Sequence, residues 1–316
     1  MCLLPQLFKK LQNQIWLSVF VFMIPNFLQA TPLEVQQIAD GVFVHRGVHE
    51  DLDEGYHGDI CNIGFIIGEQ AIAVIDTGGS MHVGQRLLET IRNVSKLPIL
   101  YVINTHVHPD HIFGNAAFVD KDTKFVGHER LAEAMEKRQD SYMRINQQWL
   151  KDDFAGSRIV KPDIAVKGQM RIDLGGRILS LQGYPTAHTN SDLTVFDEKT
   201  ATLWTGDLLF IERTPSIDGD IKGWIKVNET LLKSSAKQAV SGHGILKPQQ
   251  TWQQAMQLQQ EYLTTLLKDV RASISKNLPM EKAMDSAASS QKDRWQLFDI
   301  INRRNVNNIY PALEWE

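Results

Sequence analysis

The stretch His106-Val107-His108-Pro109-Asp110-His111 places four possible metal ligands within six positions. Imidazole nitrogens together with a carboxylate suit zinc, and one zinc ion takes three or four protein ligands. Histidine makes up 10 of the 316 residues, so three histidines beside an aspartate do not fit a chance polar turn. The apolar run 97–103 directly precedes the stretch and predicts a buried strand whose end aims these side chains into one cleft. With further ligands from elsewhere in the chain, four such groups can serve two ions.

Three more side chains of the same kinds follow short apolar runs further along the chain. His188 follows a strand that ends at residues 183–185, Asp207 follows the run 201–205, and His243 follows the run 238–241. Each lies beside glycine or another small residue, so the same context recurs three times. This repetition makes all three residues candidate ligands of the same site.

Periodicity along the chain predicts two successive sets of hairpin strands and helices. The predicted strands cover residues 41–45, 63–67, 71–75, 97–103, 124–127, 169–174, 177–181, 193–196, 201–205 and 238–241. One predicted helix begins after Ser80. The other predicted helices cover residues 129–150, 223–237, 249–276 and 279 to about 302. Two β-sheets with helices on their outer faces satisfy this order and predict an α/β class.

Composition bears on whether the protein binds nucleic acid and on whether its cysteine is reactive. The chain is 43% hydrophobic and 22% charged, which is enough apolar content for a full core. The formal charge of −4 gives no basic surface for nucleic acid, so no nucleic-acid partner is predicted. Cys61 lies in an apolar run and is predicted to be a buried structural thiol.

The first thirty residues differ from the rest and predict export. Lys9 and Lys10 precede the apolar run 15–24, and Ala30 offers a small residue at a cleavage point. The run is shorter than the roughly 20 residues that span a bilayer, so residues 1–30 are interpreted as a signal peptide rather than a retained anchor. We expect residues 31–248 to form the main domain and residues 249–316 a helical extension packed on it, with no membrane contact beyond the export signal.

These segments, in this order, resemble the metallo-β-lactamase fold superfamily over about residues 38–246. Asp76 in Ile75-Asp76-Thr77-Gly78 matches its first motif and the 106–111 stretch its second, while His188, Asp207 and His243 match the third, fourth and fifth. The resemblance implies an αββα sandwich, in which two mixed sheets pack face to face, with extra C-terminal helices here. It also implies a dinuclear site at one edge of the sandwich.

The resemblance further implies a role for each side chain. His106, His108 and His188 would hold the first metal, and Asp110, His111 and His243 the second. Asp207 would bridge both ions. Asp76 would not be a ligand and would brace the metal loop through hydrogen bonds.

One departure from the pattern narrows the resemblance. Zinc β-lactamases of the best-known subclass have cysteine where this chain has Asp207, whereas a bridging aspartate is similar to the glyoxalase II, lactonase and phosphodiesterase branches. The segments 41–45, 58–64 and 76–80 are similar to the exported quinoprotein relay system zinc metallohydrolases. That subgroup implies a bacterial periplasmic location, with a quinoprotein dehydrogenase system as a candidate partner.

The implied activity is hydrolysis. Two zinc ions would share a hydroxide near neutral pH that attacks an ester, thioester, lactone or β-lactam bond of a small molecule, and Asp110 would orient the nucleophile. Manganese or iron could replace zinc. Two alternatives stay open: an oxidoreductase with one iron, as in the persulfide dioxygenases of this superfamily, and a non-catalytic periplasmic factor for a quinoprotein.

Overall fold

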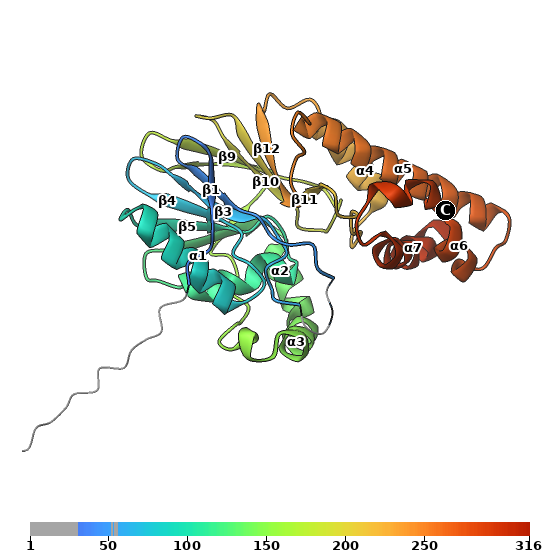
Figure 1. Cartoon of the computed structure of the whole chain (residues 1–316), viewed down its shortest axis with the longest axis horizontal. Helices are drawn as coiled ribbons and strands as arrows, with labels where there is room; N and C mark the ends of the chain where they lie inside the picture. Colours follow the sequence, from blue (N-terminus) through green and yellow to red (C-terminus); the bar gives the residue numbers. More distant parts are fainter. Residues whose placement is uncertain (1–30, 52, 54–55) are drawn as a thin grey trace, which may run out of the picture.

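The computed structural model describes residues 31–51, 53 and 56–316, which form two β-sheets packed face to face (Figure 1). The predicted signal peptide lies outside the described residues. The first sheet has seven strands in sequence order: β1 Gln36–Ala39, β2 Val42–His45, β3 Ile63–Ile67, β4 Ile72–Ile75, β5 Ile99–Ile103, β6 Lys124–His128 and β7 Ile164–Val166. The second has five, in the order β12-β11-β10-β9-β8: β12 Gln238–His243, β11 Thr202–Phe210, β10 Leu193–Asp197, β9 Ile178–Gly183 and β8 Gln169–Asp173.

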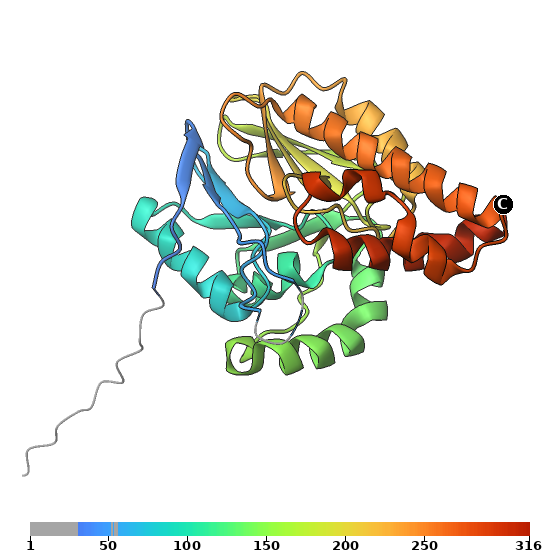
Figure 2. The same cartoon turned by 45° about the vertical axis from the view of Figure 1, so that its right-hand side comes forward.

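Helices cover the outer faces of both sheets. The helices are α1 Met81–Val94, the short α2 Pro109–Ile112, α3 Leu131–Leu150, α4 Ile221–Leu231, α5 Trp252–Ser275, α6 Met280–Ser286 and α7 Phe298–Glu314. In Figures 1 and 2, α1 lies against the first sheet and α4 and α5 against the second, while α6 and α7 extend to one side. The predicted αββα sandwich with extra C-terminal helices is confirmed.

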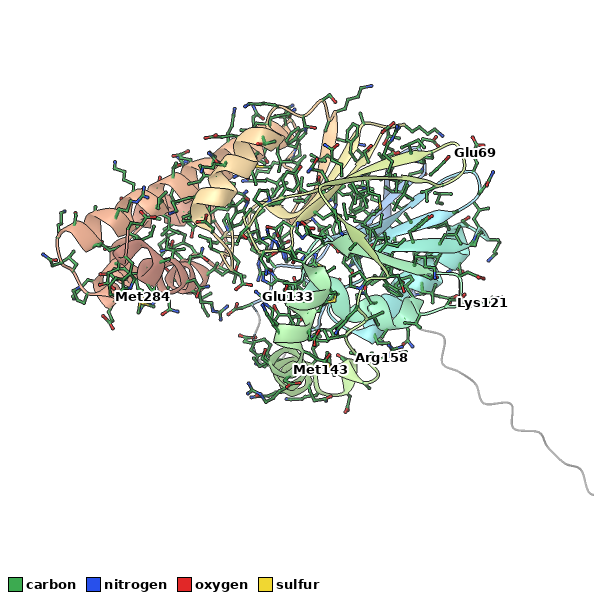
Figure 3. All side chains as sticks on the ribbon, turned by 180° about the vertical axis from the view of Figure 1, so that it is seen from behind. Glu69, Lys121, Glu133, Met143, Arg158 and Met284 are labelled. Atoms are coloured by element: carbon green, nitrogen blue, oxygen red, sulfur yellow. The ribbon has the colours of Figure 1, made fainter. Side chains whose placement is uncertain are left out.

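Apolar side chains from both sheets meet between the layers. Val44 and Ile75 of the first sheet share one buried cluster with Leu181 and Val195 of the second. Inward-facing residues alternate with more exposed ones along β9, whose apolar face is thereby buried. Figure 3 shows side chains filling the space between the sheets, with Glu69 and Lys121 at the periphery. Among the described residues, no helix combines the length and the hydropathy needed to cross a bilayer.

The sequence misplaced several boundaries. Strands β1 and β7 were not predicted, because each is four residues or shorter and carries little periodic signal. The predicted helix 223–237 is α4, which ends at Leu231; there the Ser234 hydroxyl accepts a hydrogen bond from the Ala236 N–H, an alternative to helical bonding. The predicted single helix from 279 to about 302 is wrong: the structure has α6 there, then an interruption at residues 287–297, and then α7, which continues as far as Glu314.

A buried arginine of the second sheet links the two sheets at the end opposite the histidine-rich loop. The Arg177 guanidinium is 3% exposed and donates to the Asp197 carboxylate at 3.0 and 2.6 Å. It also donates to the backbone oxygens of Ile67 and Asp40, in the turns of the first sheet, at 2.7 and 2.9 Å. One side chain thus satisfies acceptors from both layers.

Replacing Arg177 with alanine should lower the free energy of unfolding by about 3–5 kcal/mol, because Asp197 would keep a buried charge without a partner. Arg171→Ala is the matched control: Arg171 pairs with Glu198 at 2.8 Å but its side chain is 65% exposed, so the loss should be about 1 kcal/mol or less. Urea denaturation of both variants measures the difference. Equal losses would contradict the role given to the buried pair.

Candidate metal centre

The carboxyl ends of several strands meet at one edge of the sandwich and bring the predicted site residues together. His106 and His108 follow β5, and Asp110 and His111 lie in the short helix α2. The other three come from the second sheet and its loops: His188 between β9 and β10, Asp207 within β11, and His243 at the end of β12. All seven predicted ligands therefore lie at the same edge.

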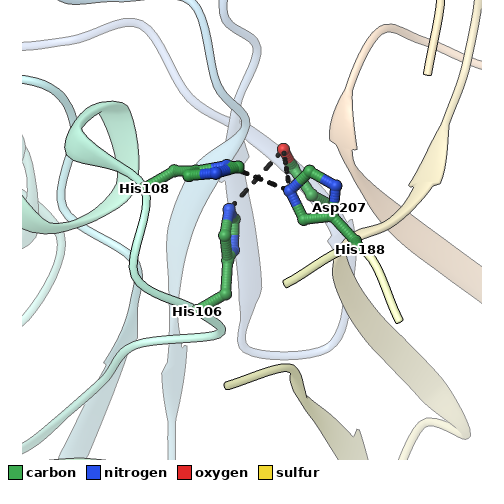
Figure 4. A group of neighbouring side chains, drawn as sticks. All are labelled: His106, His108, His188 and Asp207. Atoms are coloured by element: carbon green, nitrogen blue, oxygen red, sulfur yellow. Dashed lines mark hydrogen bonds and ion pairs between the residues drawn. The ribbon is translucent and has the colours of Figure 1, made fainter. Parts of the chain in front are cut away.

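The ligand atoms form two groups that share Asp207. In the first group the atoms of His106, His108, His188 and Asp207 lie within 4.8 Å of one another (Figure 4), and in the second those of His111, Asp207 and His243 do. One carboxylate oxygen of Asp207 lies 3.1 Å from His111 Nε2, and the other lies 3.3 Å from His188 Nε2. Asp110 Oδ2 lies 3.3 Å from His243 Nε2, on the side of the second group.

Each of the five histidines is held by an outer partner through the ring nitrogen that faces away from the centre. The outer contacts are His106 Nδ1 to Thr105 Oγ1 at 3.0 Å, His108 Nε2 to Asp218 at 3.3 Å, His111 Nδ1 to Asp76 at 2.8 Å, His188 Nδ1 to Ser216 O at 2.7 Å and His243 Nδ1 to Ile60 O at 2.8 Å. Carbonyl and carboxylate oxygens only accept, so the outer nitrogen carries the proton and the inner nitrogen presents a lone pair.

These inner atoms fit a cation. Among the described residues, the buried atoms His106 Nε2, His111 Nε2 and Asp207 Oδ1 have no hydrogen-bond partner. The inner nitrogens of His108 and His188 approach to 3.0 Å, although neither keeps a proton to donate once its outer nitrogen is protonated. Buried polar groups are otherwise almost always satisfied, so a positive ion among these lone pairs is the arrangement that satisfies them.

Asp76 positions both ligand groups. Its carboxylate accepts from the Thr105 N–H at 2.8 Å and the Thr105 hydroxyl at 2.7 Å, and from His111 Nδ1 at 2.8 Å. Because Thr105 in turn accepts from His106, one buried carboxylate orients a histidine of each group. Asp76 has a φ of 52°, a conformation unusual for a residue with a side chain.

Glycine is required beside the shared carboxylate. A Cβ at Gly242, in β12, would lie 1.8 Å from the Asp207 side-chain oxygen. The strand that delivers His243 can therefore approach Asp207 only without a side chain at residue 242.

Residues 57–245 match the family model of the metallo-beta-lactamase superfamily. The chain belongs to this superfamily. Its fold and its His/Asp cluster are those of a protein that binds divalent metal ions.

Solved structures show the same fold at low sequence identity. A metallo-beta-lactamase from Pontibacter korlensis is 22% identical with a TM-score of 0.59, covering 73% of this chain and 99% of its own. The stereoselective inverting sec-alkylsulfatase Pisa1 from Pseudomonas sp. is 16% identical with a TM-score of 0.65, covering 89% of this chain and 50% of its own. A linear primary-alkylsulfatase of Pseudomonas sp. (strain ATCC 19151) is 36% identical over 62 residues, which are 20% of this chain and 12% of that protein. The chain thus spans only part of the two sulfatases.

A cavity of about 450 Å³ opens at the cluster of this superfamily member. Ligand residues such as Asp110 and His243 form its floor. Its walls come from α3, which contributes Tyr142 and Trp149, and from α7, which contributes Ile301. These wall residues could not be predicted from the sequence, because they belong to helices whose periodicity indicates only packing.

The C-terminal extension holds the loop that completes the cavity. Asn305 of α7 donates to Pro215 O at 2.7 Å and accepts from the Ile217 N–H at 2.9 Å, and Asn308 donates to Ile217 O at 2.8 Å. This loop also carries Ser216, whose carbonyl oxygen accepts from His188. The extension therefore contributes to the geometry of the site.

Cys61 is buried against the site, as the sequence interpretation of a structural thiol requires. Its Sγ donates to Asp110 O at 2.7 Å. Burial and the nearby Asp110 carboxylate raise the pKa of the Cys61 thiol well above its usual value, which keeps it neutral. The sequence did not reveal that this thiol lies within 4.8 Å of ligand atoms of Asp110 and His111.

Opposite charges inside the centre shift its titrations. Burial opposes ionisation of Asp110 and Asp207, but the nearby His111 and His243 lower the pKa of both carboxyls below the usual range. Burial alone would lower the pKa of His111, His188 and His243, yet the Asp207 carboxylate raises the pKa of each above its usual value. Both carboxylates are therefore ionised at neutral pH, while these three imidazoles bind a proton more readily than an ordinary histidine does.

Replacing Asp76 with asparagine should lower metal affinity by about 10- to 100-fold, since His111 and Thr105 would lose a charged acceptor. Competition with a chromogenic chelator measures the affinity. Asp173→Asn is the matched control, because Asp173 is exposed and, within the described part of the chain, its carboxylate accepts a hydrogen bond only from the Gly175 N–H. An unchanged affinity in the Asp76 variant would contradict its positioning role.

Stability should depend on pH in opposite senses with and without metal. The raised pKa values of His111, His188 and His243 stabilise the metal-free fold fully below the unfolded value of about 6.5, and this contribution is lost as pH rises through the folded values. Metal binding requires the deprotonated rings, so the increase in Tm caused by zinc should be larger at pH 8 than at pH 6. Calorimetry at both pH values tests this, and an equal or smaller increase at pH 8 would contradict it.

Proposed function

We propose that the protein is a hydrolase that uses two zinc ions to cleave an ester, thioester, lactone or β-lactam bond of a small molecule. The observation that carries the proposal is the pair of ligand groups that share Asp207. One group adds three histidines to Asp207 and the other adds two, and Asp110 lies 3.3 Å from a histidine of the second group. A binding site for one ion would not need the second group.

The chain's own residues have separable tasks in this reaction. Two bound divalent ions supply a nucleophilic hydroxide near neutral pH and polarise the oxygen of the bond to be cleaved. Asp207 and the five histidines hold the reacting centre at the floor of the cavity, and their outer partners keep each ring in one orientation. Asp110 faces the cavity as an ionised carboxylate, so it can orient the nucleophile and accept a proton.

The alternative functions predict a different metal content or no turnover. An oxygenase of the persulfide dioxygenase type would use one iron, and manganese or iron could also replace zinc in a hydrolase. A non-catalytic periplasmic factor would retain metal without turnover.

Sulfate esters are a further candidate substrate, favoured by the likeness to Pisa1, which extends over more of this chain than the likeness to the β-lactamase from Pontibacter. The signal-peptide pattern and the quinoprotein resemblance support export to the periplasm and a quinoprotein dehydrogenase system as partner.

Removal of metal should abolish hydrolysis and lower Tm, because the ions stabilise only the folded chain. Purified protein should contain about two zinc ions per chain, a number that follows from the two ligand groups. Elemental analysis and activity on a panel of esters, thioesters, lactones, β-lactams and sulfate esters, before and after chelation, measure both. One redox-active iron per chain would favour oxygenation instead, and intact metal without turnover would favour the non-catalytic role.

Asp110→Asn should reduce kcat by about 100-fold or more, because the amide can neither accept the proton nor carry the charge that orients the nucleophile. Asp173→Asn, far from the cavity, should leave kcat unchanged. Metal content is measured in parallel, so that loss of a proton acceptor is separated from loss of an ion. Undiminished turnover in the Asp110 variant would remove this residue from the mechanism.

A further inference from the structure

Arg213 is a buried cation at the cavity without an ionic partner among the described residues. Its side chain follows β11, lines the cavity and belongs to a residue that is 5% exposed. It donates to the backbone oxygen of Glu50, and no described carboxylate forms an ion pair with it. The carboxylates that interact most strongly with the Arg213 charge are the candidate ligands Asp110 and Asp207. Burying a guanidinium is costly unless a negative charge compensates it.

The other two arginines of the cavity are already neutralised. Arg138 lies 3.1 Å from the Asp218 carboxylate, and Arg304 donates to both oxygens of Asp51 at 2.8 and 3.1 Å. Arg213 is thus the cavity arginine whose charge remains for a ligand. The carboxylates of Asp110 and Asp207 offset only half of the charge of two divalent ions, and Arg213 adds to the excess.

Much of the remaining wall is apolar, although Ser141, Asn146 and Asn308 also line the cavity. Tyr142, Ile145 and Trp149 on α3 face the cavity from one side, and Ile217 and Ile301 from the side of the C-terminal extension. With a volume of about 450 Å³, the cavity has room for a hydrocarbon group as well as a charged headgroup. A cavity with positive charge at its floor and apolar side chains in its walls is complementary to an anion that carries a hydrocarbon group.

We propose that the substrates are amphiphilic esters of an oxyacid such as sulfate or phosphate. The anionic group lies against Arg213 beside the metal centre, and the hydrocarbon part lies between α3 and α7. This inference rests on the proposed hydrolase function. Hydrolysis consumes one water, which gives its hydroxyl to one fragment and its proton to the other, so no further reactant is needed. Arg213 is then a specificity-determining residue that touches the substrate.

Binding of octane-1-sulfonate tests the proposal without turnover, because a sulfonate has no ester bond to cleave. Calorimetry with the zinc-loaded protein should show that the sulfonate binds at least tenfold more tightly than octan-1-ol. Arg213→Met should weaken sulfonate binding by about 10- to 100-fold and leave the alcohol unchanged. Arg213→Lys should fall between the two, which keeps the test valid if the methionine variant does not fold.

The matched control is Arg294→Met. Arg294 is an arginine outside this cavity, and its side chain is 48% exposed and pairs with Glu261. Its replacement should not change sulfonate binding. Equal binding of sulfonate and alcohol by the unmodified protein, or equal weakening of both ligands by the Arg213 variants, would overturn the proposal.

A second variant tests the apolar wall. Trp149→Ala should weaken octane-1-sulfonate binding by tenfold or more but leave methanesulfonate binding unchanged, because only the longer ligand reaches α3. Equal effects on both sulfonates would overturn the placement of the hydrocarbon part.

Turnover measurements distinguish the hydrolase function from the proposed substrate class. Octyl sulfate, octyl phosphate and the uncharged 4-nitrophenyl octanoate are compared, and Arg213→Met should lower kcat/KM by 10- to 100-fold for whichever charged ester is cleaved and by less than threefold for the uncharged one. Cleavage of the uncharged ester alone overturns the substrate class while the hydrolase function stands. Tight sulfonate binding without cleavage of any ester overturns the hydrolase function while the anion site stands.

Discussion

Buried charge at one edge of the sandwich is the constraint on which the site depends. Asp207 and Asp110 are carboxylates removed from water, and five imidazoles point their unprotonated nitrogens at the same small volume. Without a cation three of the inner atoms have no hydrogen-bond partner among the described residues. Divalent ions would give every inner atom an electrostatic partner, in competition with the protons that the imidazoles bind.

Rigid surroundings hold the ligands against that repulsion. Asp76 fixes a histidine of each group from behind, and carbonyl oxygens of Ser216 and Ile60 fix two others. Gly242 allows β12 to approach the shared carboxylate closely. Each partner sits on a strand end or on a loop that is itself hydrogen-bonded, so the ligand side chains have little freedom to turn away from the centre.

The C-terminal helices link this centre to the substrate cavity. Asn305 and Asn308 of α7 hold the 215–217 backbone, and α7 also supplies part of the apolar wall. The same extension faces α3 across the cavity. The apolar wall residues of α3 and α7 and the candidate metal ligands thus belong to different elements of the fold, which allows the walls to change while the centre is kept.

The sequence by itself determined the α/β class and the division of the strands into two sets, because both follow from periodicity along the chain. It also determined the seven candidate ligands, because metal chemistry demands particular side chains and these recur after short apolar strands. Short strands such as β1 and β7 lacked enough periodic signal to be recognised. Only the tertiary structure decided that Arg213 lacks an ionic partner among the described residues, that Cys61 supports Asp110, and that α7 closes the cavity. Such features depend on contacts between residues far apart in the chain, and the local pattern around each of them predicts only a buried or exposed position.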